Sequence, residues 1–295
     1  MRVFVTGATG FVGSAIVPEL KQAGHEVIGF ARSEAAARSL AEAGVQVHRG
    51  DMEALESLRS GAAAADGVIH TAFRHDFSNY GPAAELDRRV IEALGEVLVG
   101  TGRPLIVTSG TLMAVRRGPL ATEDDATRTD FPRKSEETAL EAVARGTAAS
   151  IVRLPPTVHG QGDHAFVPRL IALAREKGVS AYVGAGINRW AAVHRVDAAR
   201  LFRLALEKGA AGRRYHAVAD EGVQFKEIAE QIGWKLNVPV VSVAAEHAAE
   251  HFGWLATFVG LDGPTSSAKT REVLGWQPRE LDLMADLDQP YYFAS

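Results

Sequence analysis

The sequence predicts an α/β fold, with a doubly wound parallel sheet in the first half and a smaller α+β lobe after it. Three observations support this prediction. Short apolar runs without polar alternation recur through residues 1–154, as expected of parallel strands that are covered on both faces. Stretches of helical periodicity separate these runs. After Leu154, two consecutive prolines and a series of glycines change the pattern.

The strands and helices of the first half follow one another in strict alternation. The strands are expected at Val3–Thr6, Glu26–Phe30, Val45–Arg49, Gly67–Thr71, Leu105–Thr108 and Ser150–Leu154. The helices between them are expected at Phe11–Ala23, Glu34–Ala43, Glu53–Arg59, Ala83–Val99 and Ser135–Arg145. In the first helix Val12, Ile16 and Leu20 fall on one face. This alternation is typical of a doubly wound sheet.

The second half predicts a smaller mixed region. Its expected helices are Ala165–Lys177, Asp197–Lys208 and Phe225–Lys235, and its expected strands are Ala181–Val183, Arg189–Val193, Tyr215–Val218 and Val238–Val243. Residues 1–155 are therefore expected to form the first domain, with 190–218 returning to it. Residues 156–189 and 219–295 are expected to form a smaller substrate lobe. No flexible linker separates the two.

Composition excludes several classes of protein. The chain has 295 residues, of which 46% are hydrophobic and 23% charged, with a net charge of −4 and no cysteine. Such a chain is neither disordered nor held by disulfides or thiolate metal sites. Its diffuse charge gives no reason to expect a nucleic-acid or membrane surface. Without a signal-peptide pattern or a membrane-spanning run, a soluble cytoplasmic protein is expected.

A glycine-rich turn lies between the first strand and the first helix. It includes Gly7, Thr9, Gly10, Phe11, Val12 and Gly13. Glycines at this spacing permit a tight turn and a close approach of the backbone to a pyrophosphate, which the helix N-terminus then attracts. The turn predicts a Rossmann-type dinucleotide site, although a glycine turn can also serve packing alone.

The residues after the second and third strands bear on which dinucleotide binds. An acidic residue there would bind the ribose hydroxyls of NAD(H), but the chain has Arg32 and Ser33. A guanidinium and a hydroxyl suit a 2′-phosphate, so NADP(H) is favoured over NAD(H). The alternative is that both residues merely open a helix. Asp51 and Met52 are expected at the adenine, and Asp51 is also a candidate cap for the next helix, a role that can hold together with the first.

The ends of the later strands complete the expected cofactor site, because ligands bind at the carboxyl edge of such sheets. The residues placed there are Thr71, Ala72, Phe73, Thr108 and Pro155.

Several motifs resemble the short-chain dehydrogenase/reductase superfamily, in its extended and atypical branch, which is epimerase/dehydratase-like. They are the glycine-rich turn, the pair Gly50-Asp51, the run 107–111 and the segment 152–160. Markers at 194–199 and 274–278 are similar too. The resemblance spans nearly the whole chain, and it implies a Rossmann fold and a nicotinamide cofactor. It does not specify a substrate.

The chain departs from this branch at the catalytic signature, a tyrosine four residues before a lysine. If Lys134 takes the place of the lysine, Asp130 stands at the tyrosine position, and if Arg133 does, Thr129 stands there. The tyrosine is missing in both alignments, and Pro132 would disturb the helix start. The chemistry of the family therefore cannot be carried over directly.

Four residues are the candidates for catalysis. Ser109 and Thr111 could polarise a substrate oxygen, or else satisfy loop backbone groups. Lys134 could hold the nicotinamide ribose, or lie in solvent. His159 stands where the resembled family often has tyrosine, so it is a candidate proton donor or an ordinary loop histidine.

Other histidines are weaker candidates. His75 and His164 lie in loops, and His194 with Asp197 marks a junction between a strand and a helix. The spacing of His159, Asp163 and His164 matches no zinc pattern, so no metal is expected. A serine hydrolase is not indicated either, because no G-x-S-x-G sequence occurs.

The sequence thus predicts an NADP(H)-dependent oxidoreductase that transfers hydride between nicotinamide and a small or medium carbonyl or alcohol. The small lobe carries the aromatics Phe166, Tyr182, Trp190, Phe252, Trp254 and Phe258, which form a core or line an apolar pocket. Two alternatives remain: a non-catalytic NADP(H) sensor, and an epimerase or dehydratase with tightly held cofactor. A homodimer through 83–99 and 135–145 is expected by analogy.

Overall fold

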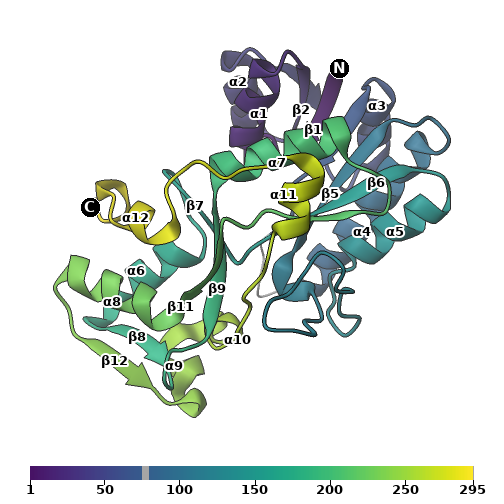
Figure 1. Ribbon diagram of the computed structural model, residues 1–295. Coiled ribbons are helices and arrows are strands. Elements are labelled where there is room, and N and C mark those ends of the chain that lie inside the picture. The colour runs from purple at the N-terminus through teal and green to yellow at the C-terminus, as the bar shows by residue number, and fades with distance from the viewer. Residues whose placement is uncertain (75–79, 295) are drawn as a thin grey trace.

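The structure is a computed structural model that describes residues 1–74 and 80–294. Seven parallel strands form the main sheet in the order β10-β6-β5-β4-β1-β2-β3 (Figure 1). They are β1 (Arg2–Thr6), β2 (Glu26–Ala31), β3 (Gln46–Arg49), β4 (Gly67–His70), β5 (Pro104–Gly110), β6 (Ala148–Leu154) and β10 (Arg214–His216). The predicted α/β fold with a parallel central sheet is confirmed, and each strand predicted before residue 155 is present.

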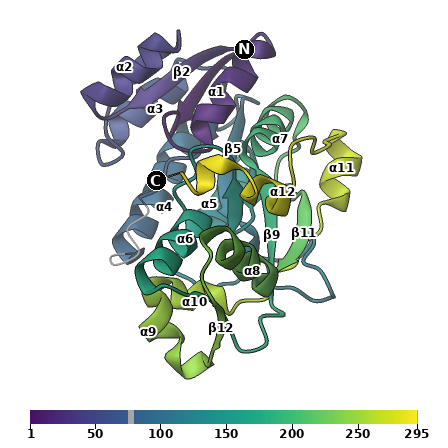
Figure 2. The same ribbon diagram turned by 90° about the vertical axis from the view of Figure 1, so that its left-hand side faces the viewer.

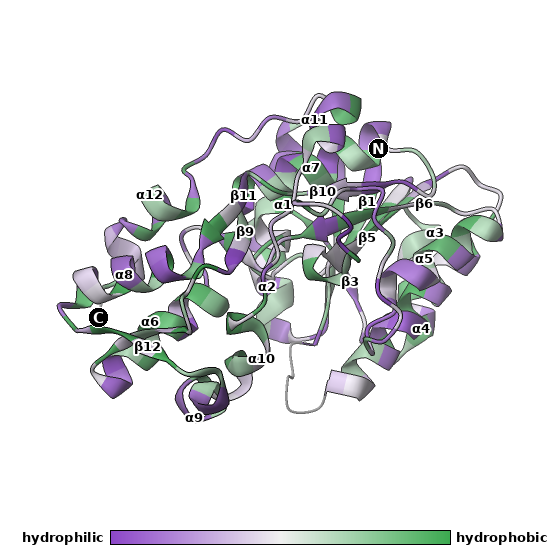
Figure 3. Cartoon of the chain, turned by 60° about the horizontal axis from the view of Figure 1, so that its bottom comes forward, coloured by the Kyte–Doolittle hydropathy of each residue, from purple (hydrophilic) through white to green (hydrophobic). Residues whose placement is uncertain are grey.

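Helices cover both faces of this sheet. On one face α1 (Gly13–Gln22), α2 (Glu34–Glu42) and α7 (Arg195–Lys208) share an apolar core with the strands. On the other face α3 (Leu55–Ala63), α4 (Tyr80–Leu98) and α5 (Ser135–Ala144) do the same. Because helices cover both faces, the inner strands β1, β4 and β5 are mostly apolar and buried, which the hydropathy colouring shows in green (Figure 3).

The order of the strands fixes where a ligand can bind. Strand β1 lies between β2 and β4, so the chain winds to one side of β1 first and to the other side afterwards. Thr6 at the end of β1 pairs with His70 at the end of β4. In open α/β sheets the ligand crevice lies outside the carboxyl ends of the strands at such a reversal. The residues after β1, β4 and β5 therefore surround the expected site.

A smaller lobe follows β6. It contains a three-stranded sheet, β11-β9-β7, and a two-stranded sheet, β12-β8. Their bounds are Thr157–His159 (β7), Ser180–Val183 (β8), Arg189–His194 (β9), Asp220–Gln224 (β11) and Val240–Val243 (β12). The helices of the lobe are α6 (Phe166–Lys177), α8 (Phe225–Leu236), α9 (Ala248–Phe252), α10 (Ala256–Val259) and α12 (Leu283–Leu287). Their apolar residues form a separate core around Trp190 and Phe225.

Strand β9 differs from the expectation that 190–218 returns to the first domain, and several short elements were not expected. The strand expected at Tyr215–Val218 is β10, which pairs with β6 and extends the main sheet. Helix α7 also packs on the main sheet, whereas β9 belongs to the small lobe. Strands β7 and β11 and the short helices α9 to α12, including α11 (Ala268–Leu274), were not expected. Each is short, so periodicity does not reveal it.

The C-terminal helix α12 lies between the small lobe and the half of the chain that carries the glycine-rich turn (Figure 2). It contacts α8 and β9. Within the described residues, the structure has no helix with both the length and the apolar character needed to span a membrane.

Candidate functional site

The glycine-rich turn has a geometry that only glycine satisfies. Gly7 has a φ of +72°, and a Cβ on it would lie 2.7 Å from the amide nitrogen of Ala72. A Cβ on Gly13, the first residue of α1, would lie 2.0 Å from the carbonyl oxygen of Gly7. The turn is closed by a 2.9 Å hydrogen bond from the Gly10 amide to the Gly7 carbonyl. The sequence therefore selects glycine here for close backbone approach.

This turn presents unpaired donors to solvent. In the described part of the chain, neither the Phe11 nor the Val12 N–H donates a hydrogen bond, and Thr9 and Gly10 are exposed. They stand at the N-terminus of α1, where the helix dipole attracts negative charge. A pyrophosphate fits this cradle, because it needs backbone donors and a close approach that a Cβ would block.

The ends of β1, β4 and β5 are tied together beside this turn. The Thr71 hydroxyl donates to the Thr6 carbonyl (2.8 Å), and the Thr108 hydroxyl donates to the His70 carbonyl (2.7 Å). The Ala72 amide contacts the Thr6 hydroxyl at 3.4 Å. Phe73 comes directly after Ala72 in the chain. These expected cofactor residues are thus brought to one edge, while Pro155 lies buried after β6.

The residues expected at the adenosine end lie after β2 and β3. Arg32 is exposed, and within the described residues it forms no ion pair. The Ser33 hydroxyl caps α2 by accepting the Ala36 amide (3.1 Å). Capping uses an oxygen lone pair, so the hydroxyl proton can still be donated to a phosphate. The helix-opening role considered for Ser33 is therefore present in the structure.

Asp51 holds a turn ahead of α3. Its carboxylate accepts the Glu53 amide at 2.9 Å and lies 3.8 Å from the Arg74 guanidinium. Helix α3 itself begins at Leu55, so Asp51 stands before the helix cap at Ala54. Met52 is partly buried against the apolar core that α3, α4 and α5 share with the main sheet.

A chain of buried polar side chains runs beneath the edge formed by β1 and β4. The Thr6 hydroxyl contacts His70 Nδ1 (2.7 Å), and His70 Nε2 contacts Asp87 Oδ1 (3.1 Å). The other oxygen of Asp87 accepts the Ser135 hydroxyl. Burial acts to raise the pKa of Asp87, but the charge of Arg133 and the hydrogen bond from His70 outweigh it and lower that pKa. Asp87 is therefore a buried carboxylate that needs a cation.

Arg133 supplies that cation. Its Nε lies 3.6 Å from Asp87 Oδ2 and donates to the Ser135 hydroxyl (2.7 Å). Its Nη2 donates to the Thr108 carbonyl at 3.1 Å, and its guanidinium lies 4.1 Å from the centre of the Phe73 ring. Only 18% of the side chain is exposed. The guanidinium is thus fixed where β4 and β5 end.

Lys134 points in another direction. Its Nζ donates to the carbonyl of Thr129 (2.6 Å) and lies 3.4 Å from Glu137, with 34% of the side chain exposed. Ser109 is the next-to-last residue of strand β5, before Gly110, and Thr111 directly follows the strand. Both side chains are buried. Among the described residues none hydrogen-bonds Thr111 Oγ1. A buried hydroxyl without a partner at this edge of the sheet is suited to hydrogen-bond a polar group of a bound ligand.

Tyr80 begins α4 next to Arg133. Its ring centre is 5.7 Å from that of Phe73 and 5.3 Å from that of Phe131. Burial raises the pKa of Tyr80, while the charge and a hydrogen bond of Arg133 act to lower it. Tyr80 and Arg133 therefore both contact Phe73, which follows β4 at the carboxyl edge of the sheet.

His159 lies in β7 and is fully buried. Its Nδ1 is 2.8 Å from Asp286 Oδ2 in α12, and within the described residues its Nε2 has no hydrogen-bond partner. Burial would raise the pKa of Asp286, but hydrogen bonds from His159 and Tyr291 outweigh it and lower that pKa. The His194 ring lies 5.5 Å away. The C-terminal segment therefore covers this histidine.

A loop of the small lobe rests on the glycine-rich turn. The Arg195 guanidinium lies 4.6 Å from the centre of the Phe11 ring and donates to the Ser14 hydroxyl (2.6 Å) and the Gln161 carbonyl (2.9 Å). The His164 ring is 5.8 Å from that of Phe11. The two lobes thus meet at the turn.

The remaining predicted residues have structural partners or lie elsewhere. Asp197, in the first turn of α7, accepts the amides of Arg279 and Glu280 at 2.9 Å, and the His194 side chain caps that helix. His75 lies outside the described residues. No group of three metal-binding side chains occurs among the residues that the structure describes.

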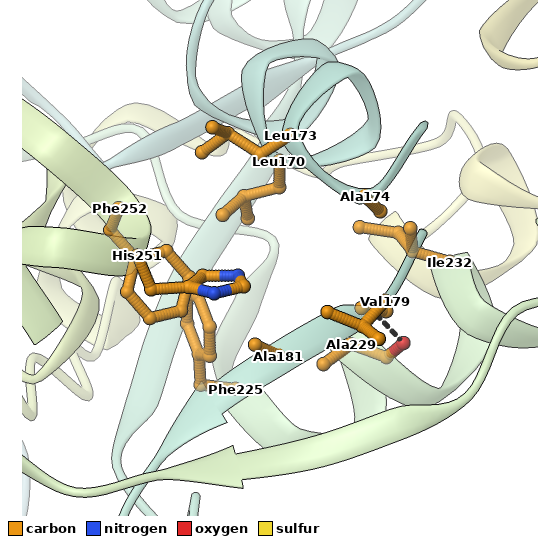
Figure 4. A pocket seen from close by; sticks show the side chains of 11 residues that line it. Leu170, Leu173, Ala174, Val179, Ala181, Phe225, Ala229, Ile232, His251 and Phe252 are labelled. Carbon is orange, nitrogen blue, oxygen red and sulfur yellow. Dashed lines mark hydrogen bonds between the residues drawn. The ribbon is translucent and has the colours of Figure 1, made fainter. Parts of the chain in front are cut away.

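The aromatic residues of the small lobe fall into two sets. Phe225 and Phe252 line an apolar cavity of about 10 Å³, too small for any ligand, with His251 beside it (Figure 4). Phe166 instead contacts Trp190, Trp254 and Phe258, with ring centres 5.1–5.8 Å apart. Trp254 is 40% exposed. Trp190 is fully buried in the core, whereas Phe166, Trp254 and Phe258 are only partly buried and form an aromatic surface beside it.

Sequence reasoning missed Asp87, His70 and the role of Arg133. One signal was present: Asp87 is a carboxylate on the otherwise apolar face of α4, beside Leu86 and Val90. A charged residue at such a position needs a buried partner. The sequence alone does not say which one.

The fold and the turn define a Rossmann-type nucleotide-binding protein. The model of the NAD dependent epimerase/dehydratase family matches residues 3–219, and the chain belongs to this family. It is 56% identical to an uncharacterised protein of Schizosaccharomyces pombe, over 99% of this chain and all of the relative. It is 28% identical to a 4-hydroxy-2-methyl-3-oxo-4-farnesyl-3,4-dihydroquinoline-1-oxide ketoreductase of Stigmatella aurantiaca, over 86% and 80% of the two chains.

Among solved structures, the chain is similar to DesIV, a dTDP-glucose 4,6-dehydratase from Streptomyces venezuelae with NAD and TYD bound. The TM-score is 0.80 at 20% identity, with 99% and 97% of the two chains covered. The resemblance found in the sequence is thereby confirmed, and the family to which the chain belongs is NAD-dependent and oxidoreductase-like.

Proposed function

We propose that the protein is an NADP(H)-dependent oxidoreductase that transfers hydride between nicotinamide and a small or medium carbonyl or alcohol substrate. The main support for this proposal is the pair of free backbone N–H groups at Phe11 and Val12, in a turn whose glycines leave room for a pyrophosphate. A nicotinamide dinucleotide bound there supplies a hydride. The chain itself has to hold the carbonyl and deliver a proton.

The preference for NADP(H) rests on the end of β2. Arg32 is exposed and unpaired among the described residues, and Ser33 is next to it, so neither of the two positions directly after Ala31 holds a carboxylate. A guanidinium binds phosphate oxygens through two charge-assisted hydrogen bonds. Asp51 and Met52 are proposed at the adenine, because they follow the neighbouring strand β3.

The substrate oxygen is proposed to bind at the end of β5. Thr111 Oγ1 is buried and, within the described residues, lacks a partner, and Ser109 lies beside it. Lys134 remains a candidate for the nicotinamide ribose and His159 for the proton donor.

An apolar substrate fits the small lobe best. Phe166, Trp254 and Phe258 form a partly exposed aromatic surface, and apolar pockets with few polar groups are typical of small-molecule sites. The relative that is a ketoreductase acts on a ketone with a farnesyl chain, by its name. This supports a carbonyl compound with an apolar body.

Two further functions are proposed as alternatives. The missing tyrosine of the family signature favours a sensor that binds NADP(H) without turnover. Membership of an epimerase/dehydratase family favours an enzyme that keeps its cofactor bound. Nucleotide that remains through purification would support the epimerase or dehydratase, and a partner that binds only with nucleotide would support the sensor.

Cytoplasmic location and a homodimer stay predictions. The outer side of α4 carries ion pairs between Arg88 and both Glu85 and Glu92, rather than an apolar stripe. A dimer through α4 and α5 would therefore be held by polar contacts. Light scattering coupled to size-exclusion chromatography measures the mass of the particle and so tests for the dimer.

The experiment that tests the function has two steps. NADPH and NADH are first titrated by fluorescence, and aldehydes, ketones and quinones are then added to the NADPH complex while absorbance at 340 nm is followed. We expect saturable binding, tighter for NADPH, and consumption with at least one compound. Absence of binding to either nucleotide would refute the proposal.

A further inference from the structure

We infer that Tyr80 and Arg133 take the places of the absent tyrosine and lysine, with Tyr80 as the proton donor and Arg133 as the cation beside it. This inference rests on the proposed function, since it assigns residues to the acid–base step of that reaction. It differs from the assignment of His159 and Lys134 that the sequence suggests.

The first argument is the fixed position of Arg133. Its guanidinium contacts the Asp87 carboxylate, the Ser135 hydroxyl, the Thr108 carbonyl and the Phe73 ring. These partners come from α4, α5, β5 and the segment after β4. Because each lies on or beside the carboxyl edge of the sheet, the charge is held at the expected ligand crevice. Lys134 makes none of these contacts and binds Thr129 and Glu137.

The second argument is the support behind Arg133. Asp87 and His70 are 3% and 1% exposed, and the chain from Thr6 through His70 and Asp87 to Ser135 is continuous. A buried carboxylate is costly unless a cation and hydrogen bonds stabilise it. Arg133 is the cation in reach, so Asp87 positions it and restricts its motion.

The third argument is the location of Tyr80. Its ring contacts Phe73 and Phe131, and the guanidinium of Arg133 lies against the same Phe73 ring. Burial raises the pKa of Tyr80 above its ordinary value, at which the hydroxyl is already protonated at neutral pH, and the charge of Arg133 acts to lower that pKa. A hydroxyl that remains protonated until the substrate oxygen becomes basic is suited to donate, and the neighbouring cation stabilises the tyrosinate that remains.

The proton and electron balance is simple. A reduced nicotinamide dinucleotide supplies the hydride, which carries both electrons and forms the new C–H bond at the carbonyl carbon. The C=O π bond breaks toward oxygen, and that oxygen takes the proton of Tyr80. The tyrosinate then takes a proton from solvent. One hydride and one proton thus convert a carbonyl into an alcohol.

The coupling between the two residues is testable without nucleotide or substrate. The chain has five tyrosines, so 3-fluorotyrosine can be incorporated and the fluorine signal of Tyr80 assigned by its loss in Tyr80→Phe. The fluorine shift is followed against pH in wild type, Arg133→Met, Lys134→Met and Arg128→Met. Arg128 is an exposed arginine paired with Asp130 and serves as the matched control.

We expect Arg133→Met to raise the titration midpoint of Tyr80 by about one pH unit, because one nearby positive charge is removed. Arg128→Met and Lys134→Met should leave it unchanged. Equal midpoints in wild type and Arg133→Met would overturn the inference, as would a shift caused by Lys134→Met alone. Melting temperatures show that each variant is folded.

The second readout separates this inference from the proposed function. With any compound that consumes NADPH, Tyr80→Phe should lower kcat by about 100-fold, within the range typical of general acid catalysis, and leave NADPH affinity unchanged. Arg133→Lys should restore part of the activity that Arg133→Met loses. Full activity in Tyr80→Phe would overturn the inference while the oxidoreductase stands. No consumption by wild type would count against the proposed function, and the fluorine titration would still decide the pairing.

Discussion

Gly13→Ala places a methyl group where the structure has no room for one. The added Cβ would lie 2.0 Å from the Gly7 carbonyl oxygen and 2.7 Å from its carbon. Because non-bonded atoms are most stable about 3.5 Å apart, the turn and α1 must separate by roughly 1.5 Å. Overpacking of this kind costs about 1–3 kcal/mol of folding stability.

The effect on nucleotide binding should be larger. If the displacement removes two charge-assisted hydrogen bonds from the Phe11 and Val12 amides, about 3 kcal/mol of binding free energy is lost, or roughly 100-fold in Kd. The assay is NADPH fluorescence titration, with thermal unfolding to show that the variant is folded.

Gly260→Ala is the matched control. No atom lies within 4 Å of a Cβ at Gly260, and its φ of −95° suits any residue. It should bind NADPH as wild type does. If folded Gly13→Ala also binds NADPH as tightly as wild type, the assignment of the pyrophosphate to this turn is wrong.

Arg32→Ala should weaken NADPH binding about tenfold with little change for NADH, because a charge-assisted contact to the 2′-phosphate is lost; equal weakening of both would remove the phosphate assignment. Asp163 is held with its pKa at about 6, above the usual value of 3.8, chiefly by burial. Its folded form therefore binds a proton more tightly than the unfolded chain, so stability falls as pH rises from about 4 to about 6. Asp163→Asn should raise the melting temperature more at pH 8 than at pH 4, and an equal change at both would contradict this. His159→Gln should lower the melting temperature, because Asp286 loses its histidine partner and keeps only the hydrogen bond from Tyr291, yet retain most of the turnover if Tyr80 is the donor.

The fold was accessible to sequence reasoning because its signals are local. Apolar runs such as Val3–Thr6 and the spacing of Gly7, Gly10 and Gly13 each lie within a few residues. Strand β10 was harder to place, since Arg214–His216 is too short to reveal that it pairs with β6. Its pairing joins Arg214 to Ile151, far earlier in the chain, and no local pattern records such a contact.

The buried polar chain depends on contacts far apart in the sequence. His70 and Asp87 are 17 residues apart, and Asp87 and Ser135 are 48 apart. The sequence showed that the tyrosine signature was missing, yet it could not show that Arg133 turns inward and Lys134 outward. That choice follows from Asp87, because a buried carboxylate selects the cation that can reach it.

The central claim is that the glycine-rich turn binds NADP(H) for hydride transfer to a carbonyl. The most direct measurement is one cuvette in which NADPH is titrated by fluorescence and then followed at 340 nm against aldehydes, ketones and quinones. The account predicts saturable binding, tighter than for NADH, and consumption of NADPH by at least one apolar carbonyl compound. A wild-type protein that is folded and binds neither nucleotide would contradict it.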